Sequence, residues 1–344
     1  MPNELIIRAD ASALMGTGHV MRCLALGEAW MDAGGRVTLV TKCTSRALLE
    51  RVRTAGFSVV ELEEVCPRPE DVATTLQIVR GHTGAHIVLD GYHFDVPYQE
   101  ALKKTGTCLL VIDDATHSEH YVADIILNQN LGAEHVSYSC EKHTRLLLGP
   151  KYALLRREFL EWRTWSRNIS DVGRHLLVTF GGSDPANSTR KAIQAVAHLD
   201  WLEAETVIAV GASNPHYDEL NTEVQLAASG IQLVQDTRQM SDLMRWADLA
   251  VSGGGSTCWE LAFMGLPNVI MVLAPNQAPV AEALAAAGVS INLGDAHQVD
   301  EATLAGALET LMYNSESRRS MSERGRALVD GFGAMRVVAA LTGE

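Results

Sequence analysis

Residues 249–261 read L-A-V-S-G-G-G-S-T-C-W-E-L, and this stretch decides the fold class. It passes from an apolar run through three consecutive glycines into a helical pattern, which predicts a buried strand, a tight turn and a helix. Such a turn exposes several backbone amides, and exposed amides of this kind bind phosphate. We therefore expect Gly254, Gly255, Ser256 and Thr257 to bind a diphosphate.

The same alternation of apolar runs and helical patterns extends along the chain in both directions, and it restarts after a polar stretch near residue 170. The expected strands are residues 5–9, 37–41, 58–61, 85–89, 107–112, 124–127, 175–180, 206–210, 231–234, 249–251, 268–271 and 290–293. Continuous apolar runs are typical of parallel strands that are covered on both faces. Two such series predict an α/β chain with two doubly wound, Rossmann-like domains, residues 1–170 and 171–344, facing each other across a cleft. The last helices are expected to belong to the second domain or to pack back on the first.

Composition and charge narrow the class of partner. The chain has 344 residues, 47% of them hydrophobic and 20% charged, and a formal net charge of -14. This negative field repels nucleic acid and anionic membranes, so a small molecule is the expected partner. The chain shows no signal peptide and no apolar run long enough to span a membrane, which predicts a cytoplasmic location. The six cysteines are scattered without a C-x-x-C pair, which favours buried free thiols over a metal site or disulfides.

A second glycine-containing loop follows the first expected strand. It reads R-A-D-A-S-A-L-M-G-T-G-H-V-M-R over residues 8–22, and Gly16 and Gly18 allow a tight turn at the start of a helix. A dinucleotide-binding fingerprint would need a third glycine where Met21 stands, and the G-K-[ST] signature of a P-loop is missing. We therefore exclude a nicotinamide site here, and expect Gly16 and Gly18 to approach a phosphate instead.

Three polar side chains of this loop are candidate functional residues. His19 lies at the mouth of the expected helix, where a neutral imidazole could accept a proton in catalysis. The alternative is that His19 is a polar residue tolerated in a first helical turn. Asp10 either orients the His19 ring by a hydrogen bond or caps the loop. Arg22, one turn after His19, either pairs with phosphate or lies exposed.

The motif F-G-G-S-D-P-A-N follows the first strand of the second series. In a functional interpretation, Gly181, Gly182 and Ser183 form a second wall for phosphate or sugar. In a structural interpretation, the motif is a tight turn in which Asp184 or Asn187 caps the next helix. Both interpretations place these residues at a strand end, where ligands bind in open parallel sheets.

Glu260 also has two interpretations. It either accepts hydrogen bonds from ribose hydroxyls, or forms a capping box with Thr257 through the T-x-x-E spacing.

Two earlier strand ends carry further polar groups. Asp90 and Tyr92 could contact a sugar in the loop D-G-Y.

The loop after the next strand contains Asp113, Asp114, His117 and His120. Two carboxylates and two imidazoles could suggest a metal site. Their spacing matches no specific ligand pattern, so we predict solvated loop residues and no metal.

Several of these motifs resemble one known family. In chain order, R-A-D-A-S, G-T-G-H-V-M-R-C-L-A-L, L-D-G-Y, V-I-D-D, T-F-G-G-S-D-P and S-G-G-G-S-T-C-W-E-L-A-F-M-G-L-P resemble the UDP-sugar hydrolases of pseudaminic acid biosynthesis. The glycine-rich segment also resembles GT-B glycosyltransferases, notably the N-acetylglucosaminyltransferase of peptidoglycan synthesis. The resemblance implies a GT-B fold that holds UDP mainly in the second domain. It also implies that His19 is catalytic, that Glu260 binds ribose, and that no metal or cofactor takes part.

The residues and the resemblance together predict an enzyme that hydrolyses a UDP-linked 2,4-diacetamido-2,4,6-trideoxyhexose. In this hypothesis His19 takes a proton from water as the water attacks the anomeric carbon, and UDP leaves. One alternative is a GT-B glycosyltransferase that uses a UDP-sugar donor. A second alternative is a non-catalytic protein that binds a nucleotide sugar.

Overall fold

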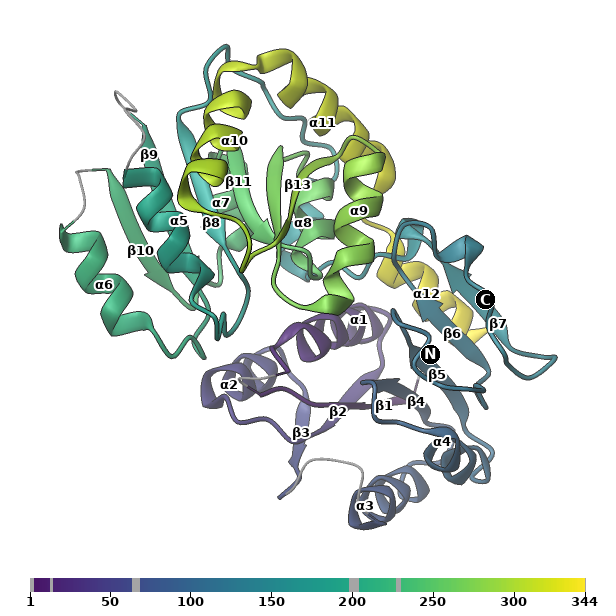
Figure 1. Cartoon of the computed structure of the whole chain (residues 1–344). Helices are drawn as coiled ribbons and strands as arrows, with labels where there is room; N and C mark the ends of the chain where they lie inside the picture. Colours follow the sequence, from purple (N-terminus) through teal and green to yellow (C-terminus); the bar gives the residue numbers. More distant parts are fainter. Residues whose placement is uncertain (1–2, 13–14, 64–68, 198–203, 227–229, 344) are drawn as a thin grey trace. The chain divides into compact units, whose positions relative to one another are not determined.

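The computed structural model describes residues 3–12, 15–63, 69–197, 204–226 and 230–343. Its strands form two sheets, and the strands within each sheet are parallel (Figure 1). The first sheet has the order β3-β2-β1-β4-β5-β6-β7, and the second has the order β10-β9-β8-β11-β12-β13. In both sheets the first three strands are added in sequence toward one edge, and the later strands are added from the centre toward the other edge, as in doubly wound domains. The predicted α/β class with two such sheets is therefore confirmed.

The first sheet is covered on both faces, because alternate residues of its strands enter two different apolar cores. In β1, Leu5 and Ile7 pack into one core and Ile6 packs into the other. The strands are β1 (Glu4–Ala9), β2 (Arg36–Thr41), β3 (Ser58–Glu61), β4 (His86–Asp90), β5 (Cys108–Ile112), β6 (Ile125–Asn128) and β7 (Arg145–Leu148). β7 was not predicted, because half of its side chains are exposed and its apolar run is short.

Within the described ranges, eight helical segments accompany this sheet or lead out of it. They are α1 (Gly18–Asp32), α2 (Arg46–Thr54), α3 (Pro69–Arg80), α4 (Val96–Lys103), α12 (Gly333–Thr342) and the 3-10 turns η1 (Ala133–His135), η2 (Pro150–Tyr152) and η3 (Arg157–Trp162). Ser45 caps α2 and Asp95 caps α4, each accepting a backbone N–H with its side chain.

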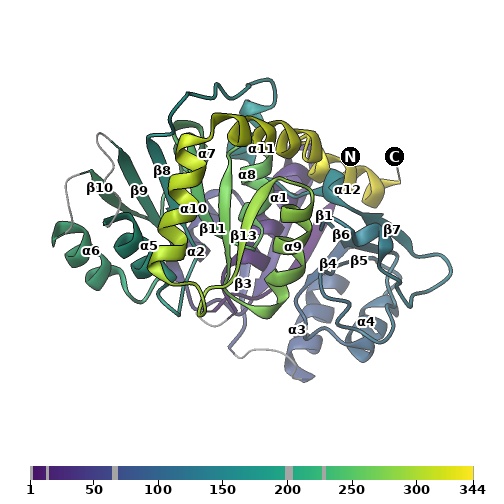
Figure 2. The same cartoon turned by 45° about the horizontal axis from the view of Figure 1, so that its top comes forward.

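The second sheet contains β8 (His175–Thr179), β9 (Glu205–Val210), β10 (Ile231–Gln235), β11 (Leu249–Gly253), β12 (Asn268–Val272) and β13 (Ser290–Asp295). Its helical segments are α5 (Ser188–Ala197), α6 (Tyr217–Leu226), α7 (Met240–Trp246), α8 (Thr257–Phe263), η4 (Pro275–Gln277), α9 (Ala278–Ala286), α10 (Glu301–Tyr313) and α11 (Ser315–Leu328). Leucines of α10 share one apolar core with α5 and the strands, and Figure 2 shows α5 and α10 on the same sheet.

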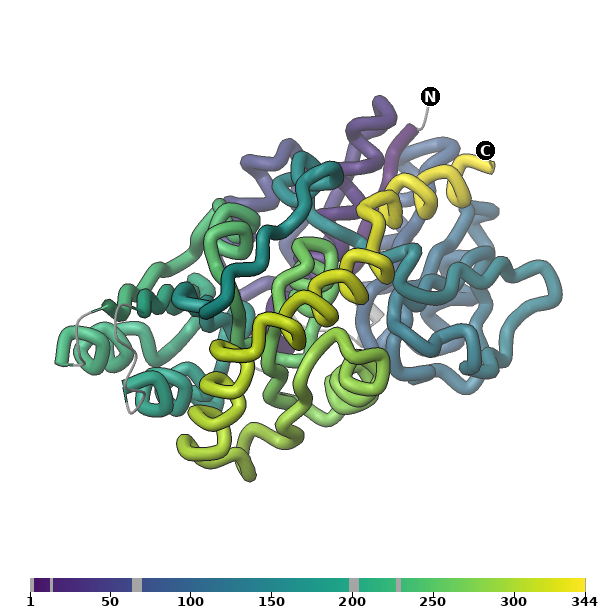
Figure 3. Tube along the Cα trace, turned by 90° about the horizontal axis from the view of Figure 1, so that it is seen from above, coloured from purple at the N-terminus to yellow at the C-terminus, as the bar shows by residue number. Residues whose placement is uncertain are grey.

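The chain divides into two compact units at a different place from the predicted border. Unit 1 comprises Met1–Arg157 and Gly331–Glu344, and unit 2 comprises Glu158–Asp330. The C-terminal helix α12 belongs to unit 1 because its apolar side chains join the same core as α1, as the yellow helix beside α1 shows (Figures 1 and 3). The approach is close at Gly333, where an added Cβ would lie 2.2 Å from the carbonyl oxygen of Ala153.

No helix in the described ranges combines the length and the apolar character that a membrane crossing requires.

Candidate active site

The first cluster of functional side chains forms where β4 ends beside the start of α1. β1 and β4 are neighbours in the sheet, and their last residues, Ala9 and Asp90, pair with each other. Asp90 is the last residue of β4 and is fully buried. His19, the second residue of α1, has its Nδ1 2.6 Å from Oδ1 of Asp90. The structure therefore forms an aspartate–histidine pair at this strand end.

Arg22 binds the same carboxylate from the next turn of α1. Its Nε donates to Oδ2 of Asp90 and its Nη2 to Oδ1, both at 2.6 Å. Its Nη1 donates to Oδ2 of Asp114 at 2.7 Å. Burial would raise the pKa of Asp90, but the charges and hydrogen bonds of Arg22 and His19 hold that pKa well below its usual range. Asp90 is therefore ionised and can only accept hydrogen bonds.

The ionised state of Asp90 decides the tautomer of His19. Since a carboxylate cannot donate, the hydrogen between His19 and Asp90 must be carried by Nδ1 of the ring. In a neutral imidazole the other nitrogen, Nε2, then bears the lone pair. His19 consequently has the tautomer that a general base needs, with Nε2 as the proton acceptor.

Tyr92 packs edge-on against the His19 ring, with the ring centroids 5.2 Å apart. Its hydroxyl donates to Oδ1 of Asp114 at 2.7 Å, so Asp114 joins Tyr92 to Arg22. Tyr92 is 39% exposed, in contrast to the buried His19, Asp90 and Arg22. Tyr92 is therefore the most exposed member of this cluster.

Asp90, and not Asp10, supplies the carboxylate next to His19, so the predicted orienting role of Asp10 is wrong. Asp10 forms an ion pair with the buried Arg8, accepts the amide of Lys42 at 2.7 Å, and lies 3.2 Å from Nε2 of His93. These contacts outweigh burial and lower the pKa of Asp10 to about 2. Arg8 also pairs with Asp71 at 2.6 Å. The R-A-D motif thus places two charged side chains in a buried structural network.

Arg22 and Asp90 differ from their sequence interpretations in a related way. Arg22 was expected to pair with phosphate or to lie exposed, but it is 7% exposed and its charge is paired with Asp90 and Asp114. Asp90 was expected to contact sugar, but it is fully buried beneath His19 and Arg22. The sequence did not reveal this pairing. His19 and Arg22 are three residues apart on α1 and therefore lie on the same face of the helix, but which strand end that face meets depends on the order of the strands in the sheet.

The predicted solvated loop after β5 is also partly wrong. Asp113 is 1% exposed, and its carboxylate lies 2.7 Å from Nδ1 of His117. The His117 side chain is 9% exposed. His120 lies apart from this pair, with Nδ1 2.9 Å from Oγ of Ser139. In the described ranges, no group of three or more His, Cys, Asp or Glu side chains is arranged to hold a metal ion.

In unit 2 the glycine turn follows β11 and leads into α8. The amide of Gly254 donates to Oε1 of Gln277 at 2.9 Å, and the same oxygen accepts the amide of Leu273 at 3.1 Å. The predicted free amide of Gly254 is therefore occupied. The amides of Gly255 and Ser256 have no hydrogen-bond partner among the described residues. Gln277 was missed from the sequence because it reaches the turn from the neighbouring strand's loop.

Glu260 lies in α8 and is 8% exposed. The capping-box interpretation required Thr257 to precede the helix as its cap. Thr257 is instead the first residue of α8, and the cap residue Ser256 makes no side-chain capping bond. The assignment of Glu260 to ribose stays a prediction.

The loop after β8 adopts the capping arrangement. Asp184 is buried and accepts the amides of Ser188 at 2.9 Å and Thr189 at 2.8 Å at the start of α5. A carboxylate at this helix start repels a phosphate from it. Gly181 has φ +83°, a left-handed backbone conformation that favours glycine, although an added Cβ would meet nothing within 4 Å. The role of Gly181, Gly182 and Ser183 as a ligand wall stays a prediction.

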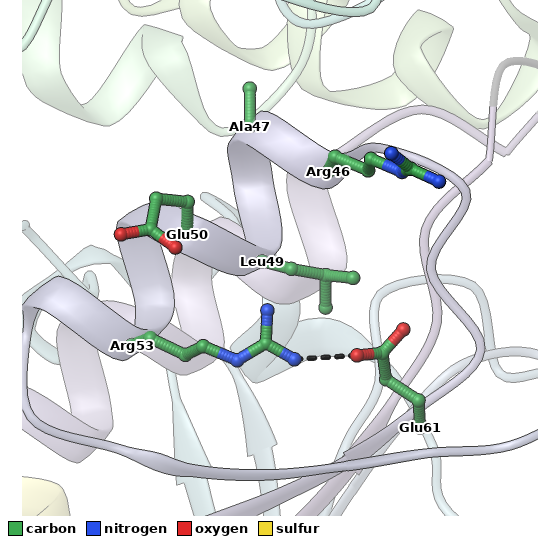
Figure 4. A pocket seen from close by; sticks show the side chains of 6 residues that line it. All are labelled: Arg46, Ala47, Leu49, Glu50, Arg53 and Glu61. Carbon is green, nitrogen blue, oxygen red and sulfur yellow. Dashed lines mark hydrogen bonds and ion pairs between the residues drawn. The ribbon is translucent and has the colours of Figure 1, made fainter.

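A surface hollow lies elsewhere in unit 1, beside α2 and the end of β3 (Figure 4). Its lining residues are Arg46, Ala47, Leu49, Glu50, Arg53 and Glu61. Arg53 and Glu61 form an ion pair across it, with both side chains about half exposed. Exposed ion pairs of this kind contribute little, and none of the predicted site residues lines the hollow. It carries no part of the candidate site.

These two sheets and their strand-end loops define a protein with the GT-B fold, as the comparison with solved structures shows. The crystal structure of Acinetobacter baumannii MurG has 16% sequence identity and a TM-score of 0.69, and the match covers 100% of both chains. The spinosyn rhamnosyltransferase SpnG complexed with thymidine diphosphate has 14% identity and a TM-score of 0.65, covering 99% of this chain and 100% of that one. Residues 176–330 match the model of the glycosyltransferase family 28 C-terminal domain.

Three further proteins are related to this chain by sequence. The Bacillus subtilis spore coat polysaccharide biosynthesis protein SpsG is 26% identical over 342 residues, covering 97% of this chain and 96% of that protein. The Campylobacter jejuni UDP-2,4-diacetamido-2,4,6-trideoxy-β-L-altropyranose hydrolase is 23% identical, covering 84% of this chain and 98% of that protein. Protein MJ1062 of Methanocaldococcus jannaschii is 24% identical, but the match spans only 55% of its length. The chain is thus related to UDP-sugar hydrolases and to glycosyltransferases.

Proposed function

We propose that this chain hydrolyses a UDP-linked 2,4-diacetamido-2,4,6-trideoxyhexose to the free sugar and UDP. The observation that carries the proposal is the Asp90–His19 pair, because it gives a buried imidazole the tautomer of a general base. The relationship to the Campylobacter jejuni hydrolase supports the reaction and the substrate class. Nucleotide-sugar binding is also typical of the GT-B family.

The chemical step is an inverting displacement at the anomeric carbon. The oxygen of water forms a bond to C1 while the bond between C1 and the diphosphate oxygen breaks, and UDP leaves with the bonding electrons. Nε2 of His19 takes the proton that water loses, and general-base catalysis of this kind contributes roughly 10²–10⁴-fold. Asp90 stabilises the imidazolium that results, because it is ionised and hydrogen-bonded to Nδ1.

The diphosphate is assigned to the glycine turn of unit 2. The amides of Gly255 and Ser256, which have no partner within the described ranges, are the donors there, since Gln277 occupies the amide of Gly254. A positioned amide that meets developing negative charge is worth about 2.7–4 kcal/mol. Glu260 is assigned to the ribose hydroxyls and Tyr92 to the sugar.

The test is to incubate the protein with UDP-2,4-diacetamido-2,4,6-trideoxy-β-L-altropyranose and, separately, UDP-N-acetylglucosamine in ¹⁸O-labelled water without an acceptor. We expect release of UDP from the first compound and ¹⁸O in the free sugar. Label in UDP instead would mean attack on phosphorus and would refute the mechanism.

A glycosyltransferase is the second candidate function, because residues 176–330 match a glycosyltransferase family model. In that case His19 would deprotonate an acceptor hydroxyl in place of water. Absence of UDP release until an acceptor sugar is added would favour this function over hydrolysis.

A further inference from the structure

The loop after β5 contains a second aspartate–histidine pair that the proposed reaction does not use. Nδ1 of His117 lies 2.7 Å from Oδ1 of Asp113, and Oδ2 of Asp113 accepts the amide of Thr116 at 3.0 Å. Burial would raise the pKa of Asp113, but the hydrogen bond and charge of His117 and the loop amides lower it below its usual value. Asp113 is therefore ionised, and Nδ1 of His117 is the donor between them. As in His19, the lone pair of the neutral ring lies on Nε2.

Nε2 of His117 is buried and has no hydrogen-bond partner within the part of the chain that the structure describes. Its side chain is 9% exposed. Most buried polar atoms are hydrogen-bonded, because folding removes the water that would otherwise bind them. An unpartnered acceptor inside an ordered aspartate–histidine pair is thus in place for a donor that arrives with a ligand.

Tyr92 connects the His117 ring to the His19 cluster. The Tyr92 ring packs edge-on against His117 with centroids 5.8 Å apart, and it packs against His19 at 5.2 Å. Tyr121 packs on His117 as well, but it is 1% exposed, whereas Tyr92 is 39% exposed. Tyr92 is therefore the neighbouring ring that can move aside without opening the core.

We propose that His117 is a second sugar-recognition residue, whose Nε2 accepts a hydrogen bond from an N–H or O–H group of the sugar once the Tyr92 ring turns away. This inference rests on the proposed function, since it takes the sugar to lie beside His19. Phosphate oxygens do not fit the position, because they are acceptors and would oppose the lone pair of Nε2. An acetamido N–H or a ring hydroxyl supplies the missing donor.

The test compares two substitutions that separate the two ring nitrogens. His117→Asn keeps an N–H close to the position of Nδ1, which preserves the bond to Asp113, and removes Nε2. His117→Gln places an amide oxygen near the position of Nε2. His120→Asn is the matched control, because His120 lies in the same loop and its ring nitrogens contact Ser139 and Glu141 instead.

The KM and kcat for UDP-2,4-diacetamido-2,4,6-trideoxy-β-L-altropyranose are measured together with the Kd for UDP alone. We expect His117→Asn to raise KM about tenfold, the effect of one lost hydrogen bond, with kcat and the Kd for UDP close to those of the wild type. His117→Gln should recover part of the loss, and His120→Asn should behave like the wild type. A KM for His117→Asn equal to that of the control overturns the inference, as does an equal weakening of UDP binding.

A second measurement does not depend on the variants folding. The ¹⁵N resonance of His117 Nε2 in the wild-type protein should shift when the UDP-sugar is added and stay unchanged with UDP. An unchanged resonance in the presence of a bound and hydrolysed UDP-sugar overturns the inference alone. If the wild type neither binds nor hydrolyses this UDP-sugar, the proposed function fails and the inference fails with it.

Discussion

The ends of β4 and β11 occupy the same position in their two sheets, each fourth in strand order. They differ in the groups that they present, which are charged side chains at β4 and backbone amides at β11. β4 ends in Asp90, a buried carboxylate bound by His19 and Arg22. β11 ends in a glycine turn, where the amides of Gly255 and Ser256 have no partner among the described residues. Side chains with paired charges therefore stand at one strand end, and bare backbone stands at the other.

This difference matches the two tasks that the proposed function assigns to these strand ends. Proton transfer needs a titratable side chain held in one tautomer, and a buried ion pair holds it at the cost of desolvating both charges. Binding an anion in a chain of net charge -14 is better done by amides, which donate hydrogen bonds without a buried cation. Under the proposed function, sheets with the same central strand order therefore carry either kind of site, depending on which residues follow the strand.

The largest expected effect comes from removing the buried charge at the end of β4. Asp90→Asn leaves the buried Arg22 without its main partner, and we expect it to lower the free energy of unfolding by about 3 kcal/mol. Asp114 still pairs with Arg22, so the chain should stay folded. Urea denaturation at pH 7 measures the loss. A change below about 1 kcal/mol, the range of exposed pairs, would contradict the buried ion pair.

The next effect separates chemistry from binding. His19→Asn retains an N–H near Asp90 but lacks Nε2, so we expect UDP release from the UDP-sugar to fall at least about a hundredfold. The affinity for UDP should stay unchanged, because UDP is assigned to unit 2. Steady-state kinetics and calorimetric titration with UDP measure the two quantities. Near-normal turnover would remove His19 from the catalytic role.

A smaller effect depends on pH. Because the pKa of Asp10 is lowered to about 2 in the folded chain from 3.8, its charged form stabilises the fold fully above pH 4. That stabilisation, about 2 kcal/mol, disappears as the pH falls through 2. Asp10→Asn should therefore be less stable than the wild type at pH 7, with a difference that narrows at pH 3. Denaturation curves at both pH values measure it, and a constant difference would contradict the shift.

The smallest expected effect tests the glycine turn after β11. An added Cβ at Gly255 would have Gln277 Nε2 as its nearest neighbour, at 3.8 Å, so Gly255→Ala should fold normally. Its methyl group would occupy space beside the amides of Gly255 and Ser256, and we expect UDP affinity to fall about tenfold, the value of one lost hydrogen bond to a charged group. Gly306→Ala, in α10 with open space around it, is the matched control. Equal UDP affinities for the two variants would refute the assigned diphosphate site.

Much of the fold could be predicted because buried parallel strands leave continuous apolar runs. The runs that became β1, β4, β8 and β11 were recognised on that basis, while β7 escaped because it is half exposed. Loops with glycine at strand ends were likewise visible, since a tight turn with φ near +80° at Gly16 and Gly181 restricts the residue type.

The pairing of charged side chains could not be predicted in the same way. Asp10 is close to His19 in sequence, and Asp90 is distant, but the sheet order places Asp90 next to the ring. The same holds for Gln277, which reaches the glycine turn from another loop. Contacts of this kind depend on tertiary arrangement, and no local pattern specifies which of several carboxylates or amides arrives.

The return of α12 to unit 1 has a consequence for how the chain is made. Ribosomes synthesise the N-terminus first, and domains generally fold as units during synthesis. Unit 2 is one continuous segment and can fold as soon as Asp330 has emerged, whereas unit 1 waits for its last helix. The half of the protein that is synthesised first is therefore finished last, and a nascent chain stopped after Asp330 would expose the apolar surface that α12 covers.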